Sequence, residues 1–175
     1  METLRATIVY IIDEIKQEVW MAKKARKVGT GYYFGYGGKI EEWQTPDENV
    51  VEETKDESGG MEIFADKLER IALIDFYKGD IKPKVPTFRV LCYRTFDFTG
   101  SPTTTEEMTD PKPFAIEDIL LEKMKENPLF KPGDELFVPQ IIAGKLIKGW
   151  IHFSDDSSEV LGYEISPCTI EDLVI

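Results

Sequence analysis

The stretch over residues 37–60 most constrains how this chain can fold, because it predicts an acidic helix between two glycine-rich turns. Thr45 suits the N-cap position, the proline after it suits the first helical position, and Glu48 completes a capping box. The pair Gly59-Gly60 offers the positive φ at which helices end. The sequence therefore predicts a helix over residues 46–58.

Three acids of this helix, Glu53, Asp56 and Glu57, stand at i, i+3 and i+4 and so share one face. Acidic helix faces are most often only solvated surfaces, and that alternative stays open. The glycine-rich entry over residues 35–38, however, lets backbone groups approach a ligand beside the carboxylates. Hard oxygen ligands of this kind favour Mg²⁺ or Mn²⁺.

The same stretch resembles the signature box of the Nudix hydrolases. In that pattern a glycine and a first Glu precede an Arg-Glu pair, which is followed by two further acids and a last glycine. Gly38 matches the first glycine, Glu53 the Glu after the Arg, Asp56 and Glu57 the acidic pair, and Gly59 the last glycine.

Four positions depart from the box. Gln44 replaces the first Glu, Glu52 the Arg, Asp56 a Glu, and Gly60 an aliphatic residue. Because Glu52 takes the place of a cation beside clustered acids, we expect lower activity or a greater demand for metal.

Length, composition and charge limit the number of domains, the kind of partner and the cellular compartment that can be expected. With 175 residues and 42% hydrophobic content, the chain is expected to form one domain over residues 1–175. Its formal net charge of −12 argues against a nucleic-acid partner but is compatible with a small phosphorylated ligand held through a metal. Cys92 and Cys168 lie far apart, and neither a signal peptide nor a membrane-spanning apolar run is evident. We therefore expect a reducing, cytoplasmic setting without a membrane partner.

Runs rich in β-branched and aromatic residues predict strands, the first two forming a hairpin. They cover residues 5–12, 18–23, 68–77, 87–96, 146–153 and 159–165. Residues 116–124 have helical spacing. Residues 136–144 fit a helix or a strand because of Pro139, and the resemblance favours a helix. His152 lies in an alternating strand, where a structural role is expected.

A basic patch follows the second strand and consists of Lys23, Lys24, Arg26 and Lys27. It either keeps a strand end soluble or attracts a polyphosphate. In the MutT-type branch of the Nudix family a similar Lys-Lys pair precedes the glycine loop. That branch also has a polar loop that ends in an acid before Met, and Glu107 is the matching residue.

The resemblance covers nearly the whole chain and is strongest to the oxidised purine nucleoside triphosphatases, which act on nucleotides such as 8-oxo-dGTP. It implies an α/β (α+β) fold with a mixed β-sheet sandwiched between helices. The implied reaction is hydrolysis of a nucleoside triphosphate to the monophosphate and pyrophosphate. The implied Mg²⁺ (or Mn²⁺) ligands are the Gly37 carbonyl and the side chains of Glu53, Asp56, Glu57 and Glu107. Either Glu53 or Glu57 would take the proton from water.

For the substrate, the resemblance implies binding by Thr7, Lys23, Phe34, Tyr36, Gly37, Gly38 and Asp134, with Lys24 an alternative to Lys23. Phe34 stands where the relatives have Asn, and Lys131 where they have a stacking Trp. Since Phe cannot read a purine edge by hydrogen bonds, a base other than oxidised guanine stays open.

Two further functions remain compatible with the sequence. One is a Nudix-fold nucleotide-binding or regulatory module with weak or no catalysis, motivated by Gln44, Glu52 and Asp56. The other is a purely structural acidic domain. The sequence does not determine an oligomeric state, and a monomer is compatible with it.

Overall fold

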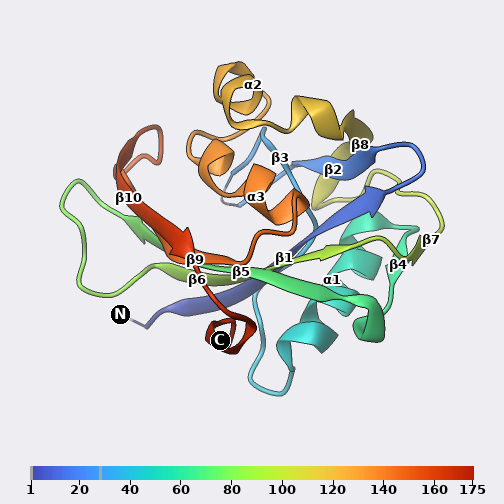
Figure 1. The fold of residues 1–175 in the computed structure, drawn as a ribbon, viewed down its shortest axis with the longest axis horizontal. Coiled ribbons are helices and arrows are strands. Elements are labelled where there is room, and N and C mark those ends of the chain that lie inside the picture. The colour runs from blue at the N-terminus through green and yellow to red at the C-terminus, as the bar shows by residue number, and fades with distance from the viewer. Residues whose placement is uncertain (1, 28) are drawn as a thin grey trace.

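The computed structural model describes residues 2–27 and 29–175 (Figure 1). Its strands are β1 (Leu4–Asp13), β2 (Glu18–Lys24), β3 (Tyr33–Phe34), β4 (Glu62–Ile63), β5 (Glu69–Lys78), β6 (Phe88–Thr95), β7 (Phe98–Thr99), β8 (Met108–Ala115), β9 (Ile147–Phe153) and β10 (Val160–Pro167). Its α-helices are α1 (Pro46–Ser58), α2 (Leu121–Glu126) and α3 (Val138–Ile142). Short 3₁₀ helices are η1 (Ala65–Lys67), η2 (Ile116–Asp118), η3 (Asp134–Leu136) and η4 (Ile170–Asp172).

Within the described residues, eight strands form one mixed sheet in the order β10-β9-β5-β6-β1-β2-β3, with β8 paired to β2. β1 runs parallel to β6 and β5 parallel to β9, while the other neighbours are antiparallel. β4 and β7 form a small separate sheet.

Helices cover both faces of the large sheet, α1 on one and α2 with α3 on the other (Figure 1). Successive side chains of a strand point to opposite faces, and β1 shows this clearly. Tyr10 and Ile12 join the apolar cluster beneath α2 and α3, whereas Val9 and Ile11 join the cluster beneath α1. The structure is therefore the mixed sheet between helices that the resemblance implied.

Helix α1 has the predicted bounds and caps. Thr45 Oγ1 accepts a hydrogen bond from the Glu48 backbone N–H at 3.2 Å, and Glu48 Oε2 accepts one from the Thr45 N–H at 2.8 Å. Gly59 ends the helix at a φ of 65°. The bounds of this helix thus agree with its local sequence signals.

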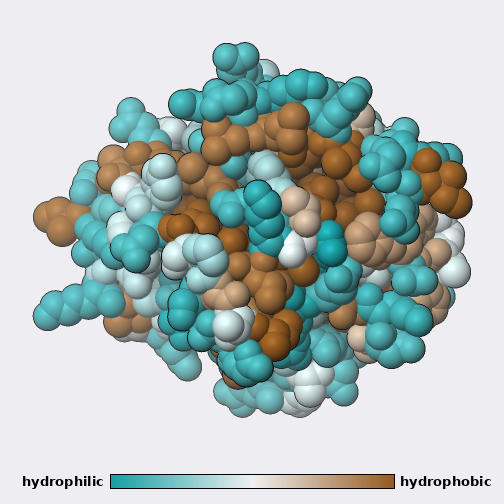
Figure 2. All heavy atoms as spheres, in the orientation of Figure 1, coloured by the Kyte–Doolittle hydropathy of each residue, from teal (hydrophilic) through white to brown (hydrophobic). Residues whose placement is uncertain are grey.

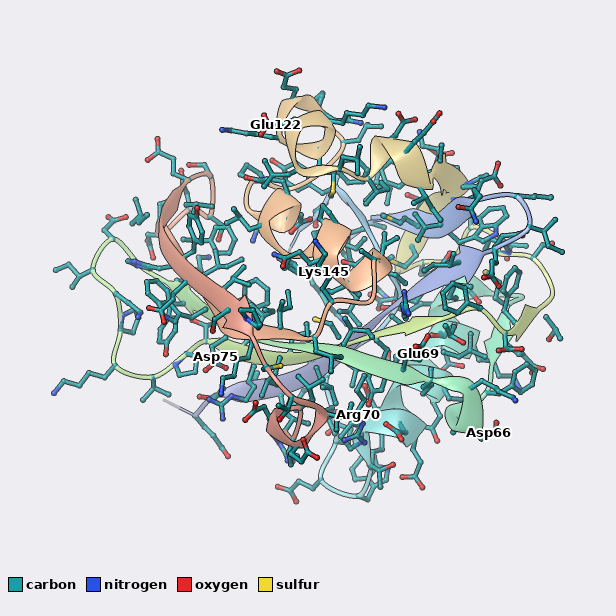
Figure 3. The ribbon with its side chains drawn as sticks, in the orientation of Figure 1. Asp66, Glu69, Arg70, Asp75, Glu122 and Lys145 are labelled. Atoms are coloured by element: carbon teal, nitrogen blue, oxygen red, sulfur yellow. The ribbon has the colours of Figure 1, made fainter. Side chains whose placement is uncertain are left out.

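The first turn of α1 is also held by the sheet. Arg70 Nη2 on β5 and the Tyr93 hydroxyl on β6 donate to Asp47 Oδ1 at 2.9 and 2.6 Å. Arg70 Nη1 further donates to the Leu173 carbonyl at 3.4 Å, so one side chain links helix, sheet and C-terminal segment (Figure 3).

The six predicted strands are confirmed as β1, β2, β5, β6, β9 and β10, and the predicted hairpin is the antiparallel pair β1–β2. The stretch over residues 136–144, left open between helix and strand, contains α3 with Pro139 in its first turn, where a missing N–H costs no helical bond.

The single helix predicted over residues 116–124 is wrong in its extent. The chain forms η2, leaves helical geometry at Ile119, and resumes in α2. Ile119 is only 2% exposed and belongs to the core cluster beneath α2 and α3, so its burial accompanies the break.

Strand β8 was not predicted, because Pro111 and Pro113 argue against a strand interior. It nevertheless pairs antiparallel with β2, with a register shift opposite Met21 and Lys23. Asp110 at the shift has a positive φ of 47°. Since β8 pairs only with β2 among the described strands, its prolines need not donate to a second neighbour.

The face viewed in Figure 2 mixes the two kinds of residue: apolar groups lie above and below its centre and at its two side edges, with hydrophilic residues between and around them. None of the helices described over residues 2–27 and 29–175 has the length and apolar character needed to cross a membrane.

Candidate active site

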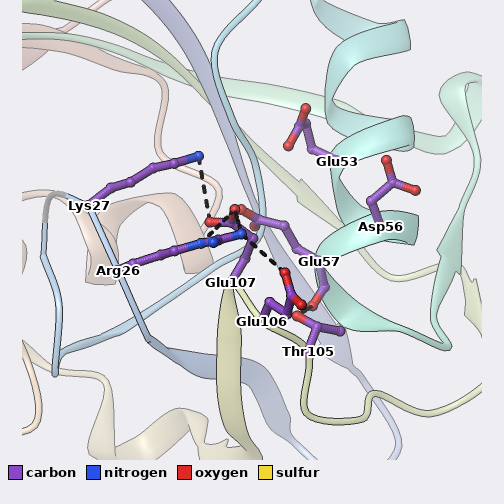
Figure 4. Close-up of a pocket in the computed structure, with 8 residues that line it drawn as sticks. All are labelled: Arg26, Lys27, Glu53, Asp56, Glu57, Thr105, Glu106 and Glu107. Atoms are coloured by element: carbon purple, nitrogen blue, oxygen red, sulfur yellow. Dashed lines mark hydrogen bonds and ion pairs between the residues drawn. The ribbon is translucent and has the colours of Figure 1, made fainter.

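The acidic face of α1 opens into a pocket of about 410 Å³ (Figure 4). Three chain segments meet there: α1, the segment after β2, and the loop before β8. The lining residues are Arg26, Lys27, Glu53, Asp56, Glu57, Thr105, Glu106 and Glu107. The structure therefore brings the three predicted helix acids and Glu107 to one cavity.

Glu57 is the most enclosed of these acids, with 6% of the residue exposed. Its Oε2 accepts a hydrogen bond from the Gly37 N–H at 3.3 Å, and its Oε1 lies 3.6 Å from Lys24 Nζ. Burial raises the pKa of Glu57, while Lys24 and the Gly37 N–H act in the opposite direction. These two contacts fix the position of the Glu57 carboxylate at the pocket.

Glu53 is half-buried against the glycine loop. A β-carbon on Gly38 would lie 2.6 Å from Glu53 Oε2, so only glycine leaves room for the carboxylate there. Burial raises the pKa of Glu53, and the neighbouring Asp56 adds to the rise. Asp56 itself is exposed at the pocket edge.

Glu107 is held by cations from the segment after β2. Arg26 donates to Glu107 Oε1 through both Nε, at 3.0 Å, and Nη2, at 2.5 Å. Lys27 Nζ lies 3.6 Å from Glu107 Oε2. The hydrogen bond from Arg26 is the main reason that the pKa of Glu107 is lowered.

The loop before β8 reaches α1 because glycines let the backbones meet. The Thr103 N–H donates to the Ser58 carbonyl at 2.8 Å, and a β-carbon on Gly60 would collide with the Ser101 carbonyl. Gly60, which departs from the aliphatic residue of the box, is thus required by this contact. Thr105 also donates from Oγ1 to the Glu57 carbonyl at 2.8 Å. Sequence reasoning missed Thr105, since no local signal shows that this loop contacts the end of α1.

The acids that line the pocket offer carboxylate oxygens, and these are the ligands that hard divalent cations such as Mg²⁺ prefer. Glu107 Oε2 is buried without a hydrogen-bond partner among the described residues, which leaves a lone-pair oxygen available to a cation. In the described part of the chain, however, no three Asp, Glu, His or Cys residues are arranged to hold a metal ion. Two cationic side chains of the protein lie beside these acids: Lys24 beside Glu57, and Arg26 beside Glu107.

Two departures from the box, Gln44 and Glu52, contact each other outside the pocket. Gln44 Nε2 donates to Glu52 Oε2 at 2.5 Å, while Gln44 Oε1 accepts from the Glu41 N–H and from Asn49 Nδ2, both at 3.0 Å. Glu52 is exposed and does not line the pocket. The Glu52 carboxylate faces the Gln44 amide, and this position argues against the expected lower activity or greater demand for metal, which stays a prediction.

The predicted substrate-binding residues lie on different faces of the sheet. Thr7 donates from Oγ1 to Asn49 Oδ1 on α1 at 2.5 Å, and Tyr36 is fully buried in the cluster beneath α1. Phe34 packs against that cluster as well. The sequence did not predict this contact of Thr7 with Asn49.

Lys23 and Asp134 lie on the opposite face. Lys23 Nζ is 5.6 Å from the centre of the Tyr33 ring, which belongs to the cluster beneath α2 and α3. Lys24, the next residue, faces Glu57. The structure thus places the two lysines that the sequence left ambiguous on opposite faces of the sheet, with Thr7 on the side of Lys24 and Asp134 on the side of Lys23.

Asp134 is a buried carboxyl group in η3, with 4% of the residue exposed. Burial raises its pKa to about 7, and Glu135 adds to the rise while Lys131 opposes it. Its charge in turn contributes to raising the pKa of Tyr10 and of Cys92, after burial of each. An acid that titrates near neutrality can act as a donor or an acceptor toward a ligand.

His152 Nε2 lies 2.6 Å from the Gly79 carbonyl, an arrangement that ties β9 to the turn after β5. This contact fits the structural role expected for it.

No protein-family model matches the chain. Among curated proteins it is 26% identical over 159 residues to the oxidized purine nucleoside triphosphate hydrolase of Mus musculus, covering 91% of this chain and 92% of that protein. It is 27% identical over 135 residues to the protein of the same name from Danio rerio, covering 77% and 78%.

Solved structures show which fold the chain shares. The mutator MutT protein from Bacillus halodurans superimposes with a TM-score of 0.74 at 20% identity, covering 95% of this chain and 99% of that one. A MutT Nudix hydrolase from Burkholderia pseudomallei gives a TM-score of 0.56 at 16% identity over 67% and 86% of the two chains. The chain therefore has the fold of the MutT and Nudix hydrolases of known structure.

Proposed function

We propose that this protein hydrolyses a phosphoanhydride bond of a nucleoside triphosphate, with Mg²⁺ or Mn²⁺, to yield the monophosphate and pyrophosphate. The observation that carries the proposal is the convergence of Glu53, Asp56 and Glu57 with Glu107 around one open pocket. Clustered carboxylates with nearby cations match what phosphoryl transfer needs, namely charge neutralisation and placement of a water. The names of the two curated relatives support the same class of substrate.

The side chains of the pocket would have two tasks, to bind the metal and to accept a proton from water. The carboxylates of Glu53, Asp56, Glu57 and Glu107, with the Gly37 carbonyl, would hold the metal, which when bound supplies positive charge to the phosphate oxygens. Glu57 is the stronger candidate for accepting the proton of the attacking water, since the Gly37 N–H and Lys24 hold it in place. Glu53 is the alternative, and its half-buried carboxylate borders the same pocket.

For the base, an oxidised purine is the first substrate to test, because both curated relatives carry that name. Asp134 would read the base by hydrogen bonds, and its pKa of about 7 allows either protonation state. Phe34 offers no hydrogen bond in place of the relatives' Asn, so we expect weaker discrimination between oxidised and ordinary purines. We further expect a small nucleotide rather than a nucleic acid as partner, and a reducing setting such as the cytoplasm.

A substrate panel tests the proposal. Purine and pyrimidine triphosphates, 8-oxo-dGTP, dinucleoside polyphosphates and nucleotide sugars would each be incubated with Mg²⁺ or Mn²⁺ and the products identified by chromatography. We expect nucleoside monophosphate and pyrophosphate from at least one triphosphate. Turnover of the sugars or dinucleotides alone would contradict the proposed substrate class.

A binding module is the second candidate, favoured by the observation that no metal site is already assembled in the described residues. Nucleotide binding with full retention of the triphosphate across the panel would support it. Hydrolysis that is lost in Glu57→Gln but kept in Glu122→Gln, an exposed carboxylate on α2, would exclude it.

A further inference from the structure

The segment that follows β2 lies over the pocket and places two cations on a single carboxylate. Arg26 binds Glu107 Oε1 with two nitrogens and also lies 3.6 Å from Glu106, while Lys27 approaches Glu107 Oε2 (Figure 4). Glu107 is one of the four acids in the proposed metal site. Its charge is therefore already neutralised by the protein in this structure.

This contact has the properties of one that can open. The Arg26 side chain is 52% exposed and that of Lys27 is 70% exposed, so solvent screens both attractions. The contact is also incomplete, because Glu107 Oε2 is buried yet has no hydrogen bond within the described part of the chain. An exchange of partners at Glu107 should therefore cost less free energy than separating a buried ion pair.

The released cations would have a clear alternative partner. A guanidinium group can bind two phosphate oxygens through parallel N–H···O bonds, whereas toward Glu107 both of its nitrogens share the single oxygen Oε1. Arg26 and Lys27 line the same pocket as the helix acids, so a polyphosphate bound there would lie within their reach.

We propose that Arg26 is an electrostatic latch: it holds Glu107 while the site is empty, releases it when a divalent cation binds, and then binds the substrate's phosphates. The proposal rests on the proposed function, since it assigns Glu107 to the metal. It extends that function by naming a group of this chain that opposes metal binding and favours polyphosphate binding. The same substitution at Arg26 should therefore have opposite effects on the two ligands.

The first measurement is Mn²⁺ binding without nucleotide, followed by calorimetry or by electron paramagnetic resonance. Arg26→Gln is expected to tighten Mn²⁺ binding by about three- to tenfold, the factor expected on removing an exposed, charge-assisted ion pair. Arg5→Gln removes the same charge from the exposed start of β1 and should leave the affinity unchanged.

A double-mutant cycle separates the latch from a general charge effect. Glu107→Gln removes the negative charge that Arg26 neutralises, so adding Arg26→Gln to it should no longer change Mn²⁺ affinity. If Arg26→Gln tightens Mn²⁺ binding equally in the wild-type and the Glu107→Gln backgrounds, the effect acts through space and the latch is overturned.

The second measurement is binding of inorganic tripolyphosphate in saturating Mn²⁺. Here Arg26→Gln should weaken binding by about tenfold, because one charged contact to phosphate is lost. Unchanged affinity for both Mn²⁺ and tripolyphosphate in Arg26→Gln, in a protein that still hydrolyses nucleotides, would overturn the latch alone. Absence of Mn²⁺ binding in wild type and variant alike would overturn the proposed function and the latch together.

Discussion

At the scale of single residues, two adjacent glycines of the loop before α1 have separate tasks. The space for a β-carbon on Gly37 is filled by the backbone carbonyl of Thr7, whereas at Gly38 it is filled by the end of the Glu53 side chain. A backbone atom in a sheet cannot move aside, but a side-chain carboxylate can.

We therefore predict that Gly37→Ala destabilises the protein and that Gly38→Ala chiefly impairs the site. Gly37→Ala should lower the free energy of unfolding by about 2 kcal/mol or more, through overpacking against β1. Gly38→Ala should cost less than about 1 kcal/mol and reduce turnover, because it displaces Glu53. Denaturant unfolding and turnover of both variants test this; equal losses of stability would contradict it.

The buried carboxyl group of Asp134 should make the stability of the protein depend on pH. Burial raises its pKa from 3.8 to about 7 in the folded protein. Between these values the folded protein keeps a proton that the unfolded chain has released, so this group's contribution to stability falls as pH rises from about 4 to about 7. Above pH 7 the folded wild type carries a buried negative charge at Asp134, whereas a variant with Asn at this position carries none.

Asp134→Asn should therefore gain stability relative to wild type by about 1 to 3 kcal/mol on going from pH 5 to pH 8. Urea unfolding at intervals across that range measures the difference. Asp66→Asn, at an exposed carboxylate, serves as the control and should show no such gain (Figure 3). A difference between Asp134→Asn and wild type that does not vary with pH would show that Asp134 is already ionised at pH 5.

At the scale of the element, α1 keeps its loop in place through the Gln44–Glu52 hydrogen bond. The two positions that carry a Glu and an Arg in the box are thus in contact here, through a hydrogen bond from an amide to a carboxylate. Gln44 needs both ends of its amide, since Oε1 accepts two further hydrogen bonds.

This contact predicts coupling between the two positions. Gln44→Glu alone places two carboxylates together and should destabilise the protein, whereas the double variant Gln44→Glu/Glu52→Arg should recover about 0.5 to 1 kcal/mol. Unfolding of the four members of the cycle measures this coupling, and strict additivity would contradict it.

The position of Glu52 also predicts how metal use responds. Because Glu52 lies outside the pocket, Glu52→Arg should leave the Mg²⁺ dependence of hydrolysis unchanged. Glu42→Arg, an equal change of charge at an exposed neighbouring position, is the control. A shift in the Mg²⁺ requirement with Glu52→Arg alone would show that Glu52 does act on the acidic site.

At the scale of the whole molecule, the fold follows from patterns that are local in the sequence. The caps of α1 and the six long strands are signalled by their own residues, and the structure confirms them. The prolines of β8 argue against a strand, and β8 forms because it pairs with β2. The break at Ile119 depends on the apolar core into which this side chain packs, and that core exists only in the assembled fold.

The site was predictable to the extent that its residues lie on one element. The spacing within α1 places Glu53, Asp56 and Glu57 on one face, and the resemblance added Glu107, which the structure brings to the same pocket. Local patterns could not show which face of β2 each lysine occupies, nor that Arg26 contacts Glu107 across 81 positions of sequence. Long-range pairs of this kind are decided by the strand register.

The most direct test of the central claim is pyrophosphate release from a nucleoside triphosphate, with and without Mg²⁺, by wild type, Glu57→Gln and Glu122→Gln. We predict Mg²⁺-dependent release by wild type and Glu122→Gln, and a loss of about 10²- to 10⁴-fold in a folded Glu57→Gln. Release that does not require a divalent cation, or that survives in Glu57→Gln at the wild-type rate, would contradict the assignment of this pocket as the active site.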